Sequence, residues 1–242
     1  MNDWLFDLGN SRFKCASFRE GVIGPVTVLP YLTETIDAFA LQELPRGRVA
    51  YLASVAAPAI TTHVLEVLKI HFEQVQVAAT VAACAGVRIA YAHPERFGVD
   101  RFLALLGSYG EGNVLVVGVG TALTIDLLAA NGCHLGGRIS ASPTLMRQAL
   151  HARAEQLPLS GGNYLEFAED TEDALVSGCN GAAVALIERS LYEAHQRLDQ
   201  SVRLLLHGGG VASLLPWLGD VVHRPTLVLD GLAIWAAVAA NV

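Results

Sequence analysis

Hydrophobic and polar positions follow two different periods along the chain, and together they predict a mixture of strands and helices. Short apolar or alternating runs predict strands at Trp4–Asp7, Phe13–Phe18, Val49–Ser54, Val114–Leu128 and Val202–Leu206. Apolar residues at helical spacing predict helices over Ala59–Val75, the second half of Glu95–Tyr109, Ser142–Gln156, Asp170–Leu198 and Gly231–Ala240. The pattern is typical of an α/β protein.

Two of these helices also carry chemical signals at their first residues. Ser142 is a favourable N-cap residue, and Pro143 suits the first helical position because its missing N–H has no intrahelical partner there. Asp170 to Asp173 place acidic side chains in the first turn of the next helix, where they complement the helix dipole. Both helix starts are therefore predicted with the correct polarity.

The chain contains a weak internal repeat. Leu5–Ser11 and Val116–Ala122 both read as a strand, a glycine turn and a small hydroxyl or amide residue. Their separation of about half the chain indicates two duplicated halves. The Gly-rich stretch at 110–113 predicts the boundary, with domains at 1–112 and 113–242.

Composition narrows the class of protein. Of the 242 residues, 52% are hydrophobic and 16% are charged, which predicts a large core or a buried subunit interface. The net charge of −7, with scattered basic residues, disfavours a nucleic-acid partner. No stretch approaches the roughly 20 apolar residues that a membrane-spanning helix needs.

Location and redox state follow from the N-terminus and the cysteines. Asp3 and Asp7 stand where a secretory signal would be basic and apolar. The four cysteines are far apart and form no CxxC pair, which favours reduced thiols over a zinc site or disulfides. We therefore expect a cytoplasmic protein.

Three glycine turns follow predicted strands, at Gly9, Gly120 and Gly208–Gly210. Glycine allows backbone N–H groups to approach an anion closely, so three such turns favour a phosphate-binding site over simple hairpins. Two rival nucleotide folds match poorly. The stretch from Gly118 lacks the third glycine of a dinucleotide loop, where Leu123 stands, and the chain has no Walker loop.

Two carboxylates are the candidates for chemistry. Asp7, at the end of the first strand, could hold Mg²⁺ beside phosphates, or could cap the hairpin as an Asx turn. Asp100 could accept a proton from an attacking hydroxyl while Arg101 counters negative charge, or the two could form a helix cap or a surface ion pair. Asp126 and His207 are interpreted as structural.

Four short motifs, in order and spacing, resemble the type III pantothenate kinase family of the actin, sugar-kinase and heat-shock-chaperone ATPase superfamily. They are Asp7–Lys14 with its Asp-Leu-Gly-Asn-Ser start, Tyr91 with Gly98–Arg101, Gly120 to Asp126, and Gly136-Gly137 with Ile139. The resemblance extends over nearly the whole chain, including Thr171 and Gly208-Gly209.

The resemblance implies two duplicated ribonuclease H-like (actin-like ATPase) domains, each a mixed five-stranded sheet flanked by helices. It implies ATP-dependent phosphorylation of pantothenate to 4'-phosphopantothenate, the first step of coenzyme A biosynthesis, by a homodimer that uses Mg²⁺. The ATP-binding residues carried over by position are Asp7, Leu8, Gly9, Asn10, Ser11, Arg12, Phe13, Lys14, Thr121, Gly208 and Gly209. The pantothenate-binding residues are Tyr91, Gly98, Val99, Asp100, Arg101 and Thr171, with Asp100 as the proton acceptor.

The sequence departs from the family pattern at two places. The family usually has an aspartate at the position of Gly118, where it helps to hold a monovalent cation, K⁺ or NH₄⁺. We therefore expect a weaker requirement for that cation. The family also usually has Pro-Gly where this chain has Ala141 and Ser142, with Pro143 one position later.

Two alternative functions remain open at this point. One is a kinase for another small hydroxylated metabolite, such as a sugar or a short-chain acid, on the same fold. The other is a non-catalytic regulatory or accessory protein, an alternative that Gly118 raises and that the presence of Asp7 and Asp100 disfavours.

Overall fold

A computed structural model describes residues 2–29 and 44–240, and the chain divides into two compact units. Unit 1 comprises Met1–Gly110, Asn131–His134 and Thr226–Val242, and unit 2 comprises Glu111–Ala130 and Leu135–Pro225. We expected a boundary at residue 112. The division next to it falls after Gly110, and two later segments join the first unit.

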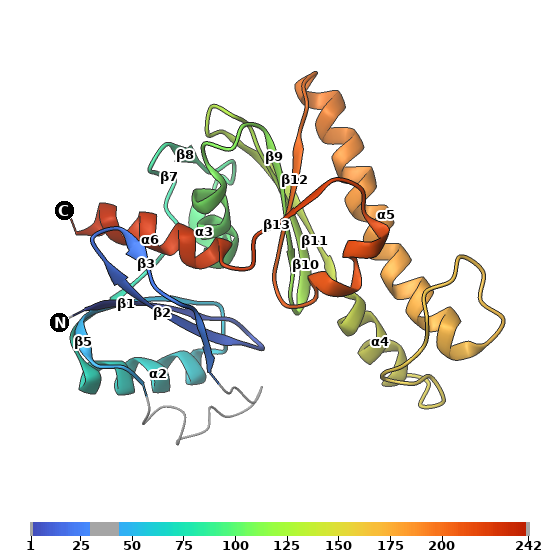
Figure 1. The fold of residues 1–242 in the computed structure, drawn as a ribbon, viewed down its shortest axis with the longest axis horizontal. Coiled ribbons are helices and arrows are strands. Elements are labelled where there is room, and N and C mark those ends of the chain that lie inside the picture. The colour runs from blue at the N-terminus through green and yellow to red at the C-terminus, as the bar shows by residue number, and fades with distance from the viewer. Residues whose placement is uncertain (1, 30–43, 241–242) are drawn as a thin grey trace. The chain divides into compact units, whose positions relative to one another are not determined.

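The first unit is built on a mixed sheet. Its strand order is β3-β2-β1-β5-β6, and the short strand β4 pairs with β2 (Figure 1). β1 runs antiparallel to β2 and parallel to β5, which in turn runs parallel to β6. The strands are β1 (Asp3–Leu8), β2 (Phe13–Arg19), β3 (Val22–Ile23), β4 (Thr27–Leu29), β5 (Gly47–Ser54) and β6 (Phe72–Val77). A small hairpin, β7 (Ala83–Cys84) with β8 (Val87–Arg88), follows.

The second unit repeats this topology. Its sheet has the order β11-β10-β9-β12-β13, with β9 antiparallel to β10 and parallel to β12, and β12 parallel to β13. The strands are β9 (Val114–Val119), β10 (Ala122–Leu128), β11 (His134–Ala141), β12 (Arg203–His207) and β13 (Val221–His223). The internal repeat predicted from the glycine hairpins is therefore present, because each sheet starts from a hairpin and adds two parallel strands in the same order.

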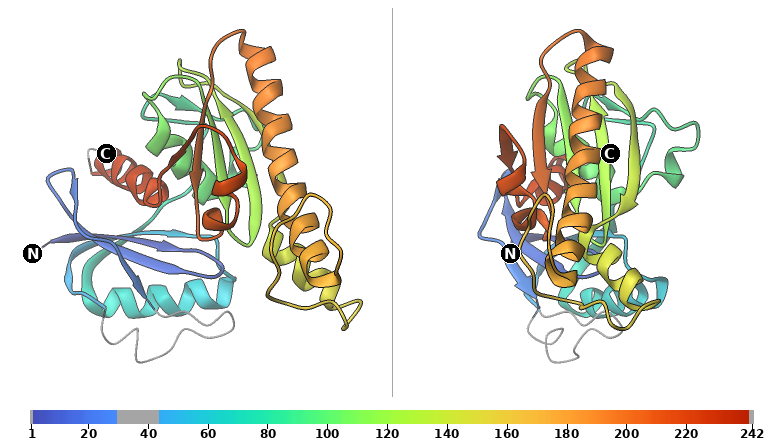
Figure 2. Two further views of the ribbon diagram at one scale, coloured as in Figure 1. Left: turned by 45° about the vertical axis from the view of Figure 1, so that its right-hand side comes forward. Right: turned by 90° about the vertical axis from the view of Figure 1, so that its right-hand side faces the viewer.

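Five α-helices lie within the described residues: α2 (Pro58–His71), α3 (Val99–Ser108), α4 (Pro143–His151), α5 (Thr171–Leu198) and α6 (Leu227–Ala239). In unit 1, α3 packs extensively on α6. In unit 2, the long α5 packs on β9 and β10, and both views of Figure 2 show it beside that sheet. Among the described residues, none of the helices combines the length and apolar character needed to cross a bilayer.

Both predicted helix starts are confirmed. The Ser142 hydroxyl accepts a hydrogen bond from the Leu145 N–H (3.2 Å), and Pro143 is the first helical residue. The Asp170 carboxylate accepts one from the Asp173 N–H (2.9 Å) and caps α5.

Two predicted helix ends were wrong, and one strand was missed. The helix expected over Ala59–Val75 ends at His71, and Phe72–Val77 forms β6 instead. The helix expected to reach Gln156 ends at His151. The strand β11 had not been predicted from the glycine-containing segment that forms it.

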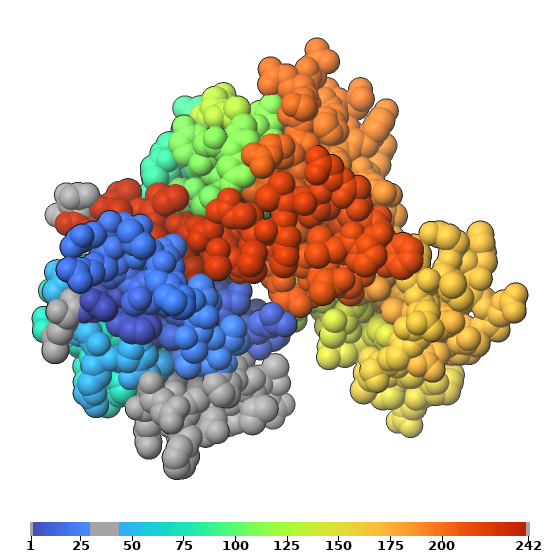
Figure 3. All heavy atoms as spheres, viewed as in Figure 1, coloured from blue at the N-terminus to red at the C-terminus, as the bar shows by residue number. Residues whose placement is uncertain are grey.

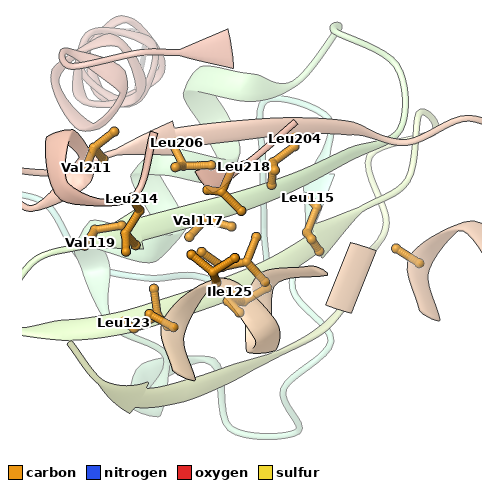
Figure 4. Close-up of a cluster of buried hydrophobic side chains, with 14 of the residues drawn as sticks. Leu115, Val117, Val119, Leu123, Ile125, Leu204, Leu206, Val211, Leu214 and Leu218 are labelled. Atoms are coloured by element: carbon orange, nitrogen blue, oxygen red, sulfur yellow. The ribbon is translucent and has the colours of Figure 1, made fainter. Parts of the chain in front are cut away.

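Each unit has its own hydrophobic core. In unit 1, Phe6, Phe13 and Phe72 pack together between the sheet and α2. In unit 2, side chains of β9, β10 and β12 meet those of α5 and of the segment after β12, as Figure 4 shows for Val117, Ile125 and Leu206. The strands that carry the candidate phosphate turns are thus anchored by fully buried apolar residues.

Candidate active site

The hairpin between β1 and β2 positions the first predicted phosphate turn. The Gly9 N–H donates to the Arg12 carbonyl (2.9 Å), which closes the turn between Leu8 and Phe13. Leu8 and Phe13 are fully buried, so only their backbone groups can face a ligand. Asp7 and Lys14 stand opposite each other in the strand register, and both are half-buried. The hairpin therefore places an acidic side chain and a basic side chain opposite each other near its turn.

Asp100 lies in the first turn of α3. Its Oδ1 accepts a hydrogen bond from the Arg101 N–H (2.8 Å), which fixes the carboxylate at the helix N-terminus. Gly98 leaves room for it, because a Cβ at residue 98 would lie 2.7 Å from that same Oδ1. The Asp100 side chain thus satisfies one N–H group in the first turn of α3, as a capping residue does. The same hydrogen bond fixes the orientation of the carboxylate.

The two predicted carboxylates influence each other. Burial raises the pKa of Asp7 to about 6, the nearby Asp100 adds to the increase, and Lys14 opposes it. Two anions that share a site disfavour each other's charged form. Asp7, Lys14 and Asp100 therefore form one electrostatic cluster inside unit 1.

Arg101, the residue after Asp100, packs against two aromatic rings. Its guanidinium carbon is 4.4 Å from the centre of the Phe97 ring and 5.9 Å from that of Tyr91. Its Nη1 donates a long hydrogen bond to the Tyr91 hydroxyl (3.4 Å). Arg101 is only 6% exposed. Such cation–π packing holds a buried guanidinium in one orientation, so Tyr91 and Arg101, predicted to bind the same substrate, do lie together.

Two residues that pack around Tyr91 and Arg101 were not predicted from the sequence. Phe97 packs edge-on against Tyr91 (4.9 Å between ring centres), and His134 lies 5.0 Å from Phe97 and 6.1 Å from Tyr91. Phe97 immediately precedes the Gly98–Arg101 motif, which is a signal that could have identified it. No local signal marks His134, because it enters the cluster from a distant segment.

The second phosphate turn lies in unit 2, between β9 and β10. The Gly120 N–H donates to the Ala122 carbonyl (2.9 Å), which leaves Thr121 exposed at the tip. The glycines after β12 lie against the end of β9, since the Gly210 N–H donates to the Val119 carbonyl (2.9 Å). Gly208 has φ +100°, and a Cβ there would lie 2.4 Å from that carbonyl oxygen. The two predicted glycine turns of unit 2 are therefore neighbours.

Gly118 faces two polar side chains. A Cβ at this position would lie 2.7 Å from Thr124 Oγ1 and 3.0 Å from His207 Nε2. The imidazole of His207, which pairs with Gly118 in the β9–β12 register, thus occupies space that a side chain at 118 would need. His207 was interpreted as a structural residue, and this packing agrees with that interpretation.

Ser142 links the second phosphate turn to α4. Its hydroxyl donates to the Thr121 carbonyl (2.9 Å) while it accepts from the Leu145 N–H. The side chain is 1% exposed. Where the family pattern has Pro-Gly, this chain therefore has a hydroxyl that fixes the backbone of Thr121.

The remaining predicted residues are placed as follows. Asn10, Ser11 and Arg12 are exposed on the first turn, and Val99 begins α3. Thr171 is the first residue of α5 in unit 2 and is exposed. The predicted ligand residues are thus divided between the units. Asp7 to Lys14, Tyr91 and Gly98 to Arg101 belong to unit 1, and Thr121, Thr171 and Gly208-Gly209 belong to unit 2.

The donor set of unit 1 suits Mg²⁺ better than a metal held by protein ligands alone. Mg²⁺ in phosphoryl-transfer sites is held by one or two carboxylates together with water and phosphate oxygens. Asp7 and Asp100 supply two carboxylates that repel each other, and a cation between or beside them relieves that repulsion. Within residues 2–29 and 44–240, no group of three or more His, Cys, Asp or Glu side chains could enclose an ion.

Comparisons with known sequences agree on one family. A family model described as type III pantothenate kinase matches residues 4–193. A protein named type III pantothenate kinase from Xylella fastidiosa (strain 9a5c) is 99% identical over 242 residues and covers both chains completely. One with the same name from Xanthomonas euvesicatoria pv. vesicatoria (strain 85-10) is 62% identical over 241 residues, again covering both chains completely.

Solved structures with little sequence identity share the fold. A conserved putative Baf family transcriptional activator from Campylobacter jejuni matches with a TM-score of 0.66 at 20% identity, covering 99% of this chain and 100% of its own. The activator of 2-hydroxyisocaproyl-CoA dehydratase from Clostridium difficile, with bound ADPNP, matches with a TM-score of 0.52 at 11% identity, covering 100% and 96%. These matches confirm the predicted actin-like ATPase fold.

Proposed function

The chain belongs to the type III pantothenate kinase family, whose reaction is the ATP-dependent phosphorylation of pantothenate in coenzyme A biosynthesis, and we propose that the unit 1 cluster carries its chemistry. The assignment of residues rests on the joint placement of Asp7, Lys14 and Asp100. Asp7 stands opposite Lys14 in the β1–β2 register, and Asp100 is close enough to raise the pKa of Asp7. We also propose that the protein acts in the cytoplasm, because its reaction consumes ATP.

Asp100 is the proton acceptor in this proposal. Its carboxylate takes the proton from the primary hydroxyl of pantothenate as the oxygen attacks the γ-phosphorus, and the bond to the ADP oxygen breaks. The Arg101 N–H donates to Oδ1 and so fixes the carboxylate at the start of α3. Arg101, fixed over Phe97, supplies positive charge for an anionic group of the substrate.

The turn residues bind the phosphates. Backbone N–H groups from Asp7 to Lys14 form the first phosphate loop, Thr121 belongs to the second, and Gly208-Gly209 lie near the adenosine. Lys14 adds a cation beside Asp7. Tyr91, Gly98, Val99 and Thr171 are the further pantothenate-binding residues of this proposal. The duplicated halves are taken as 1–112 and 113–242. Catalysis of phosphoryl transfer depends mainly on such positioning and electrostatics.

Asp7 is the residue that holds Mg²⁺ in this proposal. The chemistry that a divalent cation held by Asp7 would supply is neutralisation of charge on the β- and γ-phosphates. Its binding also favours the ionised form of Asp7, which burial alone disfavours.

A monovalent cation has a smaller role here than the family pattern implies. Gly118 offers no carboxylate, and the space beside it is filled by Thr124 and His207. We propose modest activation by K⁺ or NH₄⁺, through backbone carbonyls and a hydroxyl.

The active form is proposed to be a homodimer, but the apolar side of α5 is not its interface. Ala183 is fully buried in the core of unit 2, and Leu186 and Leu191 pack against that core. The exposed apolar surface instead includes Phe167, at 96% exposure, beside an open groove of about 760 Å³ between the 164–168 segment, α5 and Trp217. This segment is part of the yellow surface on the right of Figure 3. Such apolar exposure favours a second copy as its partner.

A coupled assay of ADP release tests the proposed function. Purified protein with ATP, Mg²⁺ and pantothenate should release ADP at a rate that depends on pantothenate, and the product should be 4'-phosphopantothenate by mass. Sugars and short-chain hydroxy acids serve as controls for another metabolite kinase. ADP release that is unchanged by pantothenate, or faster with a control substrate, contradicts the proposal.

A further inference from the structure

The segment from Asn131 to His134 belongs to unit 1, although its neighbours on both sides belong to unit 2. It lies along residues 88–90, the stretch that leads into Tyr91. The Arg88 N–H donates to the Gly132 carbonyl (2.9 Å), and the Ala90 N–H donates to His134 Nδ1 (3.4 Å). Arg88 and Cys133 also form an isolated parallel β-bridge. The segment is thus tied to the backbone just before the substrate-binding tyrosine.

His134 brings an aromatic ring to this junction. The ring is nearly parallel to Tyr91, with an interplanar angle of 21°, and tilted by 45° against Phe97. His134 is 3% exposed and Phe97 is 2% exposed. Because Nδ1 accepts the Ala90 N–H, the neutral ring carries its proton on Nε2. One side chain therefore contacts both aromatic rings beside Arg101 and the backbone that leads to one of them.

Two of these three rings pack directly on Arg101. Its guanidinium packs on Phe97 and donates to Tyr91, so its position depends on the orientation of both rings. The Phe97 backbone is fixed separately, since the Thr80 hydroxyl donates to its carbonyl (2.8 Å). The orientation of the Phe97 and Tyr91 rings, in contrast, depends on what packs behind them. Among the ring contacts of the described residues, His134 is the side chain that lies against both.

We infer that His134 is a positioning residue for pantothenate, which orients Tyr91 and Phe97 and through them Arg101. The inference rests on the proposed function of this cluster. His134 does not touch the reacting atoms in this scheme. Its removal should weaken substrate binding and leave the proton transfer at Asp100 largely intact, because Asp100 is held by the helix start rather than by the rings.

Three variants separate the two contacts of His134. His134→Ala removes the ring and the acceptor, His134→Phe keeps a ring, and His134→Asn keeps an acceptor near Nδ1. His134→Ala should raise the KM for pantothenate about three- to tenfold, the range for loss of an aromatic contact. The KM for ATP should stay unchanged within about twofold, and kcat within about threefold. The other two variants should lie between wild type and His134→Ala.

A matched control is His71→Ala. The His71 ring is half-buried in unit 1 and hydrogen-bonds the Leu44 carbonyl (3.0 Å), away from the cluster. This change should lower the melting temperature without changing the KM for pantothenate. Calorimetric titration with pantothenate should give the same ranking as the kinetics, and thermal melts verify that each variant is folded.

The outcomes separate the inference from the proposed function. If wild-type protein neither binds nor phosphorylates pantothenate, the proposed function is refuted and this inference with it. If wild type is active and the folded His134 variants keep the KM for pantothenate, or change both KM values equally, the inference alone is refuted. Should His134→Ala not fold, the Phe and Asn variants decide the question by the same criteria.

Discussion

Replacing Asp7 by asparagine should stabilise the metal-free protein above pH 6, although it damages the active site. The pKa of Asp7 in the folded protein is about 6, against an ordinary value of 3.8. That difference corresponds to about 3 kcal/mol against the ionised form, at 1.36 kcal/mol for each tenfold change in proton affinity. Because Asp7 is only half-buried, water screens part of this cost, and we expect about 1–2 kcal/mol.

The sign follows from proton linkage. The folded state holds the proton more tightly than the unfolded state, so the cost is absent below pH 3.8. It increases as the pH rises from 3.8 to about 6 and is constant above that. Asparagine is neutral throughout. Asp7→Asn should therefore be more stable than wild type at pH 8, and this advantage should disappear towards pH 4.

Urea unfolding at pH 4, 5, 6 and 8, in EDTA and without nucleotide, measures this difference. Asp3→Asn is the control on the same strand, because it removes an ion pair with Arg48 (2.7 Å) and should give no gain in stability. With Mg²⁺ and ATP, Asp7→Asn should have a lower rate and a higher Mg²⁺ concentration for half-maximal rate. A variant that is less stable than wild type at pH 8, or whose advantage does not change with pH, refutes the reasoning.

Three further predictions address the base, the assembly and the cation site. Asp100→Asn should lower kcat by about two to four orders of magnitude with much less effect on pantothenate binding, and near-normal turnover in steady-state kinetics would exclude its role as base. Light scattering at micromolar concentration should give twice the chain mass of 25.7 kDa, and Phe167→Glu should shift it towards a single chain; a wild-type mass near 25.7 kDa contradicts the dimer. Exchanging Na⁺ for K⁺ at fixed ionic strength should raise the rate less than about tenfold, and an enzyme inert without K⁺ refutes this. Gly118→Asp should lower the melting temperature because its Cβ meets Thr124 and His207, and pairing it with His207→Ala should recover part of that loss and increase the dependence on K⁺.

The sequence predicted the helices and strands whose apolar residues follow a clear period. It missed the strands that form mainly because they pair with a neighbouring strand. The strands around Asp7 and Gly120 and the long helix after Asp170 were predicted well, because their apolar patterns and caps agree. Phe72 and Val75 continue the helical spacing of the preceding residues, so β6 was read as helix although the chain is already extended at Phe72. β11 contains Gly136 and Gly137, which have low strand propensity, and it becomes a strand by pairing with β10.

Of the residues in the candidate site, those in local motifs were predicted and those brought in by packing were not. Asp7 and Asp100 were recognised because each lies in a short motif, at a strand end or a helix start. Their mutual effect on the pKa of Asp7 could not be predicted, since it depends on how α3 packs relative to the first hairpin. His134 was missed for the same physical reason, because its contacts with Tyr91 and Phe97 join segments more than 30 positions apart in the sequence.

The close approach of Gly118 to His207 also limits how this site can evolve. A side chain gained at position 118 collides with the imidazole and with Thr124, so that mutation is harmful when it occurs first. A smaller residue at position 207 leaves a gap and removes one of these two collisions, so it can arise first and reduce the cost of the other. The two positions are therefore epistatic, with a preferred order of change. Relatives that carry a carboxylate at the position of Gly118 should carry a smaller side chain at the position of His207.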